Sequence, residues 1–308
     1  MTGFENRAGL TVSSSKMQLV EIVYKNGRFN LGNVDEAYFN ESINFEKDKD
    51  TKIISIIQSA FNELLIKNKL KSKSVSFALP FELFYIIQVP YHNTLLHQDL
   101  EEELRWEFSV LYPFTPTKDL SIQYIEVEKN NLINFNSVIA VAIQRKFITL
   151  FQNFCSDNNL KLDFIDNIHT ASERALTVNL PDAAKGLNLS IYFCNKFLSL
   201  LFTLNGKPVQ FKLIPLNDAG EIPSILLTET SPQESFGINR NLIDQVFISG
   251  EEISNTIIKA LENTLVVPIS NFNPFEKIKP VPELIENRYY SEKFNSFSSA
   301  AGIALRIA

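Results

Sequence analysis

Glycine is scarce in this chain, which has 10 glycines among 308 residues. At the average usage of about 7%, a chain of this length would carry roughly twice as many. Loops that cradle phosphate groups depend on glycine, because the backbone there must approach the ligand closely. Each glycine that remains in a candidate loop is therefore informative about function.

Cysteine and histidine are also rare. Cys155 and Cys194 lie in different segments without metal-ligand spacing, which excludes a disulfide framework and favours two buried free thiols in a reducing compartment. The spacing of His92 and His97 does not place both on one helix face, so a surface or capping role is favoured over a metal site; His169 stands alone. No Ser, Cys or Thr stands in a recognisable nucleophile motif.

The chain has no excess of positive charge and no long apolar run. Its net charge is −6 and its pI about 5.3, which gives no electrostatic footprint for nucleic acid or an anionic membrane. The longest apolar stretches, such as Leu198–Leu204, fall far short of the ~20 residues that span a bilayer. Residues 1–9 lack a signal-peptide core. We therefore expect a cytoplasmic protein that reaches a membrane only through a partner.

Two parts of the sequence share the layout of a short strand, an alternating strand, an Asn-Gly turn and a further strand. The first covers residues 8–34 with its turn at Asn26-Gly27, and the second covers 188–214 with its turn at Asn205-Gly206. Asn-Gly between alternating runs favours a type I′ turn, because both central residues need positive φ. The repeated layout predicts a duplicated three-stranded meander.

The other elements follow from hydrophobic periodicity and from proline and glycine positions. Helices are expected at 53–70, 95–111, 145–158, around 172–176, at 252–263 and at 297–306, and strands at 75–79, 83–89, 120–127, 135–143, 160–165, 246–249 and 265–268. Leu100, Leu104, Phe108 and Leu111 share one face of the second helix, and the acidic run at 101–103 complements its dipole. Residues 215–240 and the tail to Asn295 are expected to be mostly loop. The order indicates an α/β protein with mixed sheets rather than simple βαβαβ winding.

Particular motifs carry a resemblance to a known family. Residues 9–22 read G-L-T-V-S-S-S-K-M-Q-L-V-E-I, in register with G-L-D-I-G-S-S-S-V-K-L-V-E-L at the start of PilM-like proteins. Further matching pieces follow in the same order: Val75–Pro80, Val89-Pro90, Glu101–Glu103, Trp106-Glu107, Tyr112–Phe114, Val138–Ile143, Phe164–Asp166, Ala171, Arg174–Leu176, Asn273–Phe275 and Ala301–Arg306. The chain thus resembles, over nearly its whole length, a degenerate member of the PilM family of type IV pilus assembly proteins.

The resemblance implies an actin-like (ribonuclease H-like) α/β fold, related to that of FtsA, with two duplicated halves. It implies a first half at 1–72, an inserted partner-binding βαββα subdomain at 73–166, an inter-half crossing helix at 167–186, and a second half with a C-terminal crossing helix at 187–308. Small residues in the helices at 167–176 and 297–306 would let them pack closely. Only 215–245 remain for the second half's helical subdomain, which is therefore expected to be reduced or absent.

The same resemblance locates three loops that grip nucleotide in actin-like ATPases. Thr11 and Tyr192 stand at the two acidic metal positions, Ser13 and Cys194 stand at two glycine positions, and the adenosine turn reads Ile248-Ser249-Gly250-Glu251-Glu252. Carboxylates beside Gly250 would repel a polyphosphate. The vestigial loops are Ser13, Ser14, Ser15 and Gly250, although a plain polar hairpin turn also explains the serines. The sequence predicts no catalytic residues, no enzyme activity and no cofactor, with ATP and Mg²⁺ disfavoured.

Two classes of function remain. The resemblance favours a scaffold that binds the cytoplasmic N-terminal segment of an inner-membrane PilN-like protein, in a groove formed with residues 75–165. Phe81, Phe84, Tyr85 and Tyr91 are candidates there, although a core or edge role explains them better. The alternative is a divergent ATPase or nucleotide-gated switch that still binds ATP. A related secretion platform and a homo-oligomer both stay open, and nucleic acid is not an expected partner.

Overall fold

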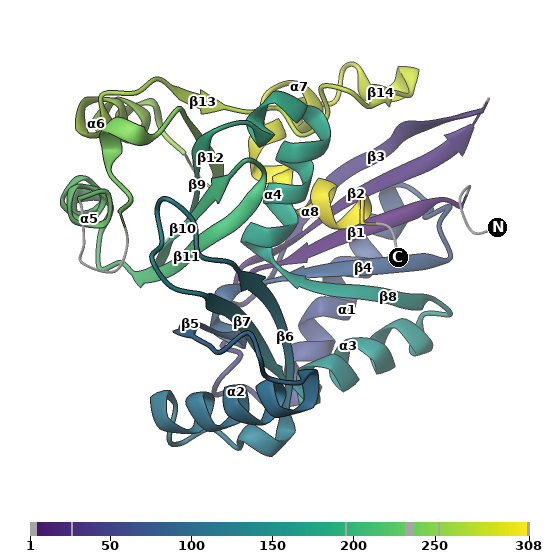
Figure 1. Cartoon of the computed structure of the whole chain (residues 1–308). Coiled ribbons are helices and arrows are strands. Elements are labelled where there is room, and N and C mark those ends of the chain that lie inside the picture. Colours follow the sequence, from purple (N-terminus) through teal and green to yellow (C-terminus); the bar gives the residue numbers. More distant parts are fainter. Residues whose placement is uncertain (1–4, 26, 195, 232–236, 252, 307–308) are drawn as a thin grey trace. The chain divides into compact units, whose positions relative to one another are not determined.

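The computed structural model, shown in Figure 1, describes residues 5–25, 27–194, 196–231, 237–251 and 253–306. Asn26 of the first predicted turn and Glu252 of the adenosine turn lie outside the described residues. The chain forms two compact units. Unit 1 contains Met1–Leu83, Phe147–Pro181 and Phe272–Ala308, and unit 2 contains Phe84–Lys146 and Asp182–Asn271.

A six-stranded sheet is the centre of unit 1, in the order β14-β3-β2-β1-β4-β8. Its strands are β1 (Arg7–Val12), β2 (Lys16–Lys25), β3 (Arg28–Tyr38), β4 (Ser74–Leu79), β8 (Lys161–Asn167) and β14 (Lys279–Pro280). β1, β2 and β3 form the predicted antiparallel meander, and β4 pairs in parallel with both β1 and β8.

Helices cover both faces of this sheet (Figure 1). α1 (Asp50–Lys67) and α3 (Arg145–Asp157) cover one face, where the ring of Phe154 contacts both Phe61 and Phe77. α4 (Ile168–Asn179) and α8 (Ser298–Ala304) lie on the other face. A Cβ on Gly302 would overlap with the carbonyl oxygen of Ala171 in α4. The predicted close packing of these two helices through small residues is therefore confirmed within unit 1.

Unit 2 repeats the arrangement in a five-stranded sheet, in the order β11-β10-β9-β12-β13. Its strands are β9 (Leu187–Cys194), β10 (Phe197–Leu204), β11 (Lys207–Pro215), β12 (Gln245–Gly250) and β13 (Ile269–Asn271). The turn between β10 and β11 has φ of 50° at Asn205 and 76° at Gly206, as a type I′ turn requires. β12 pairs in parallel with β9 as β4 does with β1, so the predicted duplication of the meander is confirmed.

A three-stranded sheet in the order β5-β7-β6 completes unit 2. It is built from β5 (Phe84–Pro90), α2 (His97–Leu111), β6 (Leu120–Val127) and β7 (Ser137–Gln144). Leu100, Leu104 and Phe108 of α2 are buried on this sheet as predicted. Leu111 was expected on the same face, but it is 52% exposed because the helix ends there.

One side chain joins the two sheets of unit 2. The Gln88 amide of β5 donates to the carbonyl oxygen of Val209 at 2.9 Å and accepts from the backbone N–H of Phe211 at 3.4 Å. Val209 and Phe211 belong to β11, which is an edge strand of the five-stranded sheet. A glutamine side chain therefore takes the hydrogen bonds that a neighbouring strand would take.

Several boundaries differ from the sequence-based expectation. α5 (Ile222–Glu229) lies in the region expected to be loop, because Pro223 occupies the first turn of a helix, where proline is favourable. α6 (Asn255–Leu265) begins later than expected because Ser254 caps it by accepting from the N–H of Ile257. The last strand is at β13 rather than 265–268, and the tail contains β14 and α7 (Arg288–Ser291).

The predicted inserted region at 73–166 contributes to both units. Its outer strands β4 and β8 pair within the six-stranded sheet, whereas β5, β6 and β7 form the separate three-stranded sheet. The domain boundaries given above stay predictions. In the described residues between β11 and β12, α5 is the sole α-helix, which agrees with the expected reduction of the second helical subdomain. Among the residues that the structure describes, every helix falls short of the length or apolar character of a membrane span.

Candidate functional site

The serine turn Ser13–Ser15 connects β1 to β2 in unit 1. The Ser13 hydroxyl oxygen accepts from the backbone N–H groups of Ser15 and Lys16, both at 3.2 Å, and the Ser13 N–H donates to the Lys16 carbonyl at 3.0 Å. Backbone N–H groups in such a turn are the donors that a phosphate would use. Two of them are already satisfied by the side chain that replaces glycine in the family pattern.

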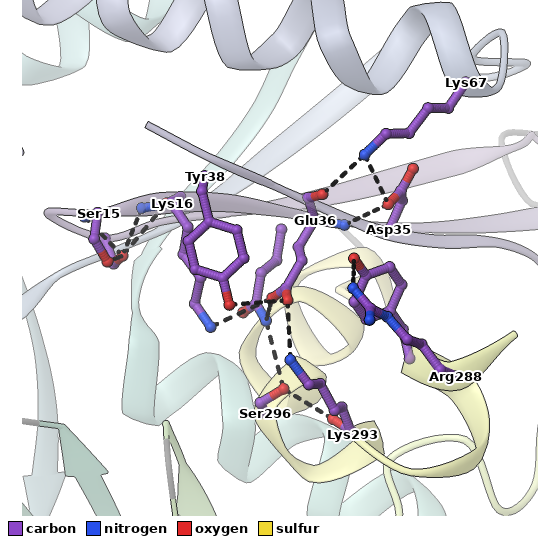
Figure 2. A network of polar contacts seen from close by, with 12 residues as sticks. Ser15, Lys16, Asp35, Glu36, Tyr38, Lys67, Arg288, Lys293 and Ser296 are labelled. Carbon is purple, nitrogen blue, oxygen red and sulfur yellow. Dashed lines mark hydrogen bonds and ion pairs between the residues drawn. The ribbon is translucent and has the colours of Figure 1, made fainter. Parts of the chain in front are cut away.

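Lys16 follows this turn directly, and its charge is compensated inside the protein. Its Nζ lies 3.4 Å from Oε2 of Glu36, whose side chain is only 1% exposed. The other oxygen of Glu36 lies 3.4 Å from Nζ of Lys293 and accepts from the Tyr38 hydroxyl at 3.2 Å. Figure 2 shows these side chains converging on Glu36 from β2, β3 and the C-terminal segment.

The Glu36 carboxylate is held in its charged form by these partners. Burial raises the pKa of Glu36, but the charges of Lys16 and Lys293 and hydrogen bonds from Gln18 and Tyr38 outweigh it, so that the pKa is lowered overall. Gln18 Nε2 donates to Oε2 at 3.2 Å. Glu36 is therefore a buried anion that already has two cations, and the cation next to the serine turn is not free for a ligand.

The adjacent Asp35 makes a second contact, toward α1. Lys67 at the end of α1 lies 3.6 Å from Oδ1 of Asp35 and donates to the carbonyl oxygen of Glu36 at 3.3 Å (Figure 2). Burial raises the pKa of Asp35 even though this lysine opposes the shift. Lys67 is thus a structural contact between α1 and β3.

The two positions where the family pattern has metal-binding aspartates are buried. Thr11 is 3% exposed, and within the described part of the chain its hydroxyl oxygen has no hydrogen-bond partner. Tyr192 lies fully buried among the largest core side chains of unit 2. Neither residue offers the carboxylate oxygens that Mg²⁺ requires.

Gly250, the surviving glycine of the adenosine turn, has a structural reason to be glycine. Its φ is 124°, and a Cβ there would overlap with the carbonyl oxygen of Phe193 on the neighbouring strand. The N–H of Glu251 donates to that same carbonyl oxygen at 3.0 Å. The backbone of β9 occupies the space where a side chain at position 250 would lie, so this glycine is explained without a phosphate.

The vestigial loops fall in different units, with Ser13, Ser14 and Ser15 in unit 1 and Gly250 in unit 2. Their role as a nucleotide site stays a prediction, and the groups present around them do not fit ATP and Mg²⁺. Sequence reasoning missed the Glu36 cluster entirely. One of its contacts, from Lys293 to Glu36, joins residues 257 positions apart, which no local pattern indicates.

The remaining candidates take structural roles. Phe81 and Phe84 are buried, the Tyr85 hydroxyl accepts from Gln144 at 3.0 Å, and the Tyr91 hydroxyl donates to Glu126 at 2.6 Å. These contacts are those of core and edge residues.

Histidines and cysteines are likewise explained by the fold. His169 is completely buried in α4, and burial lowers its pKa to about 3. Cys155 and Cys194 are not joined in a disulfide, and burial raises the pKa of Cys155 to about 12. Cys194, predicted to be buried, is only half-buried because it lies at the end of β9. Three or more metal-ligating side chains do not gather anywhere in the described ranges.

No protein-family model and no curated protein matches this sequence. Solved structures match it by fold. A structure of the PilM-PilN type IV pilus biogenesis complex has a TM-score of 0.71 at 17% identity, over 97% of this chain and 98% of that chain. A Bacteroides thetaiotaomicron protein of unknown function with an actin-like ATPase fold has a TM-score of 0.54 at 14% identity, over 88% of this chain and 94% of that chain. The expected actin-like fold and the likeness to PilM are therefore confirmed at the level of the fold.

Proposed function

We propose that this actin-like protein is a cytoplasmic scaffold of a type IV pilus or a related secretion assembly platform. In this role it binds the cytoplasmic N-terminal segment of an inner-membrane PilN-like protein and does not turn over ATP. The single observation that carries the proposal is the internal closure of the serine turn, where Ser13 Oγ accepts from the N–H groups of Ser15 and Lys16.

The closure of the loops argues against nucleotide capture at two loops, the serine turn and Gly250. A phosphate at the serine turn would have to displace Ser13 Oγ from two N–H groups, each hydrogen bond being worth about 1 kcal/mol. To pair with Lys16, the phosphate would also have to separate it from Glu36. The buried Glu36 carboxylate would then lose one of its two cations, which costs free energy. At Gly250 the approach is filled by Phe193.

The fold and the available strand edges support this choice of partner. A solved structure of similar fold is that of a PilM-PilN complex. A protein that keeps this fold without a working nucleotide site is expected to function through a partner bound elsewhere on its surface. β6 is an edge strand of the three-stranded sheet, to which an extended peptide can add by backbone pairing. A membrane-anchored partner would hold the protein at the inner membrane.

Calorimetry with Mg-ATP tests the first half of the proposal. We expect no binding at sub-millimolar ligand in the natural chain. The variant Ser13→Gly frees the N–H groups of Ser15 and Lys16, so a gain of phosphate affinity in this variant would identify Ser13 as the block. Sub-millimolar affinity in the natural chain would favour the nucleotide-gated switch instead.

Titration with a synthetic peptide that copies the cytoplasmic N-terminal segment of a PilN-like inner-membrane protein tests the second half. The expected result is saturable binding, with none for a scrambled peptide of the same composition. Absence of binding at high micromolar peptide would refute this partner.

A further inference from the structure

Helix α2 has two apolar regions, of which the fold uses one. Leu100, Leu104 and Phe108 face the three-stranded sheet and are buried there against residues such as Ile87 and Val138. An amphipathic helix on a sheet is expected to expose polar residues on its opposite side. Figure 1 shows α2 along the outside of this sheet.

That opposite side exposes large apolar groups. Trp106 is 62% exposed, Val110 is 54% exposed, and Phe114, just beyond the helix end, is 99% exposed. Trp106 and Val110 are four residues apart and therefore lie one turn apart on the same side of the helix. Single exposed apolar residues are common, but aromatic and aliphatic groups gathered over consecutive turns are typical of an interaction surface.

Acidic residues continue the same side toward the start of the helix. Asp99, Glu102 and Glu103 precede Trp106 by seven, four and three residues. In the described residues, no basic side chain forms an ion pair with these three. The nearby Arg105 is already engaged: it pairs with Glu101 at 2.7 Å and donates to the carbonyl oxygens of Thr117 and Leu120.

We propose that this outer side of α2, formed by Asp99, Glu102, Glu103, Trp106, Val110 and Phe114, docks a basic amphipathic segment of a partner protein. Charge complementarity identifies the occupant: lysines or arginines lie against the acidic half, and apolar side chains lie against the Trp106 half. Aromatic residues at the centre and charges at the rim are the usual composition of such an interface. The proposal does not rest on the pilus function or on the PilN-like peptide.

Trp106 is the only tryptophan of the chain, so its fluorescence reports directly on this surface. The probe is a synthetic leucine-lysine peptide of about five helical turns, roughly 18 residues, with leucine at helical spacing. Two control peptides carry glutamate in place of lysine, or the same residues in scrambled order. We expect a blue shift of the Trp106 emission with the basic amphipathic peptide alone, weakening as salt rises.

Matched variants locate the binding. Glu102→Lys with Glu103→Lys is expected to weaken binding by about tenfold or more, since two rim charges are reversed. Val110→Ser and Phe114→Ser are expected to weaken it severalfold while keeping the reporter. The control is Glu283→Lys with Glu286→Lys, which changes the net charge equally around the exposed Ile285 of unit 1 and should leave binding unchanged.

Five outcomes would overturn the proposal, four of them in the binding measurements. These are equal binding of the scrambled or acidic peptide, equal loss in the control variant, no emission shift with any peptide, and a shift only with phosphatidylcholine vesicles, which would assign the surface to lipid. Sedimentation of the protein without peptide tests whether a second copy of the chain occupies this surface. Self-association that is lost in the Glu102→Lys, Glu103→Lys variant would assign the surface to homo-oligomerisation and overturn the proposal too.

Discussion

The backbone of Gly250 lies against the carbonyl oxygen of Phe193, in a place where no side chain fits. We therefore expect Gly250→Ala to lower the free energy of unfolding by about 3 kcal/mol or more, since backbone strain and overlap add. Gly27→Ala is the control: its φ is also positive, but no atom lies within 4 Å of the added Cβ. It should cost only about 1–2 kcal/mol. Urea unfolding followed by circular dichroism measures both, and equal losses would contradict the packing argument.

The Ser13 hydroxyl holds the serine turn closed. Ser13→Ala removes the acceptor for the N–H groups of Ser15 and Lys16, so we expect a loss of about 1 kcal/mol in unfolding free energy, as for a lost cap. Ser14→Ala at the next position should change it by less than about 0.5 kcal/mol. A larger effect at Ser14 than at Ser13 would show that the turn is held in another way.

Glu36→Gln tests the buried cluster of Figure 2. The change leaves Lys16, whose side chain is largely buried, without its carboxylate, and the loss of a buried partner costs about 3–5 kcal/mol. Adding Lys16→Met to Glu36→Gln should recover part of that loss. The exposed Glu292→Gln serves as the control and should leave the unfolding free energy nearly unchanged.

The same carboxylate gives a pH dependence. Because the pKa of Glu36 is lowered in the folded protein, its contribution is fully present above the pKa of the unfolded chain and is lost as the pH falls through the lower folded value. The difference in stability between the natural chain and Glu36→Gln should therefore shrink in acid. A difference that stays constant down to strongly acidic pH would contradict this assignment.

His169 gives a separate acid sensitivity. Its folded pKa is about 3 because of complete burial, so between about 3 and the usual 6.5 the unfolded chain binds a proton that the folded chain does not. Stability should fall with decreasing pH across this window, by at most about 1.4 kcal/mol per pH unit from this residue. His169→Gln should flatten the curve, whereas the exposed His92→Gln should not.

Local patterns predicted the elements that local chemistry determines. The alternation of β2 and the Asn205-Gly206 turn identified both meanders, because strand period and positive φ are readable from neighbouring residues. α5 was missed because residues 215–240 were expected to be mostly loop, although Pro223 stands at a helix start, where proline is favourable.

The candidate site was less predictable. Lys16 and Glu36 are both local to the first meander, but Lys293 reaches Glu36 from the other end of the chain. Gly250 was predicted as a remnant of a nucleotide-binding loop. The sequence alone does not distinguish a glycine that makes room for a ligand from one that makes room for a neighbouring strand. Asp166 likewise pairs with both Arg174 and Arg306. These residues belong to three of the motifs that carry the family resemblance, and only the fold brings them into contact.

Gln88 has a consequence for how copies of this chain meet one another. By occupying Val209 and Phe211, its amide removes from β11 the free N–H and C=O pair on which a strand of a second molecule could grow. Uncovered edge strands are prone to join edge to edge into aggregates. One glutamine thus covers part of the outer strand of a duplicated meander.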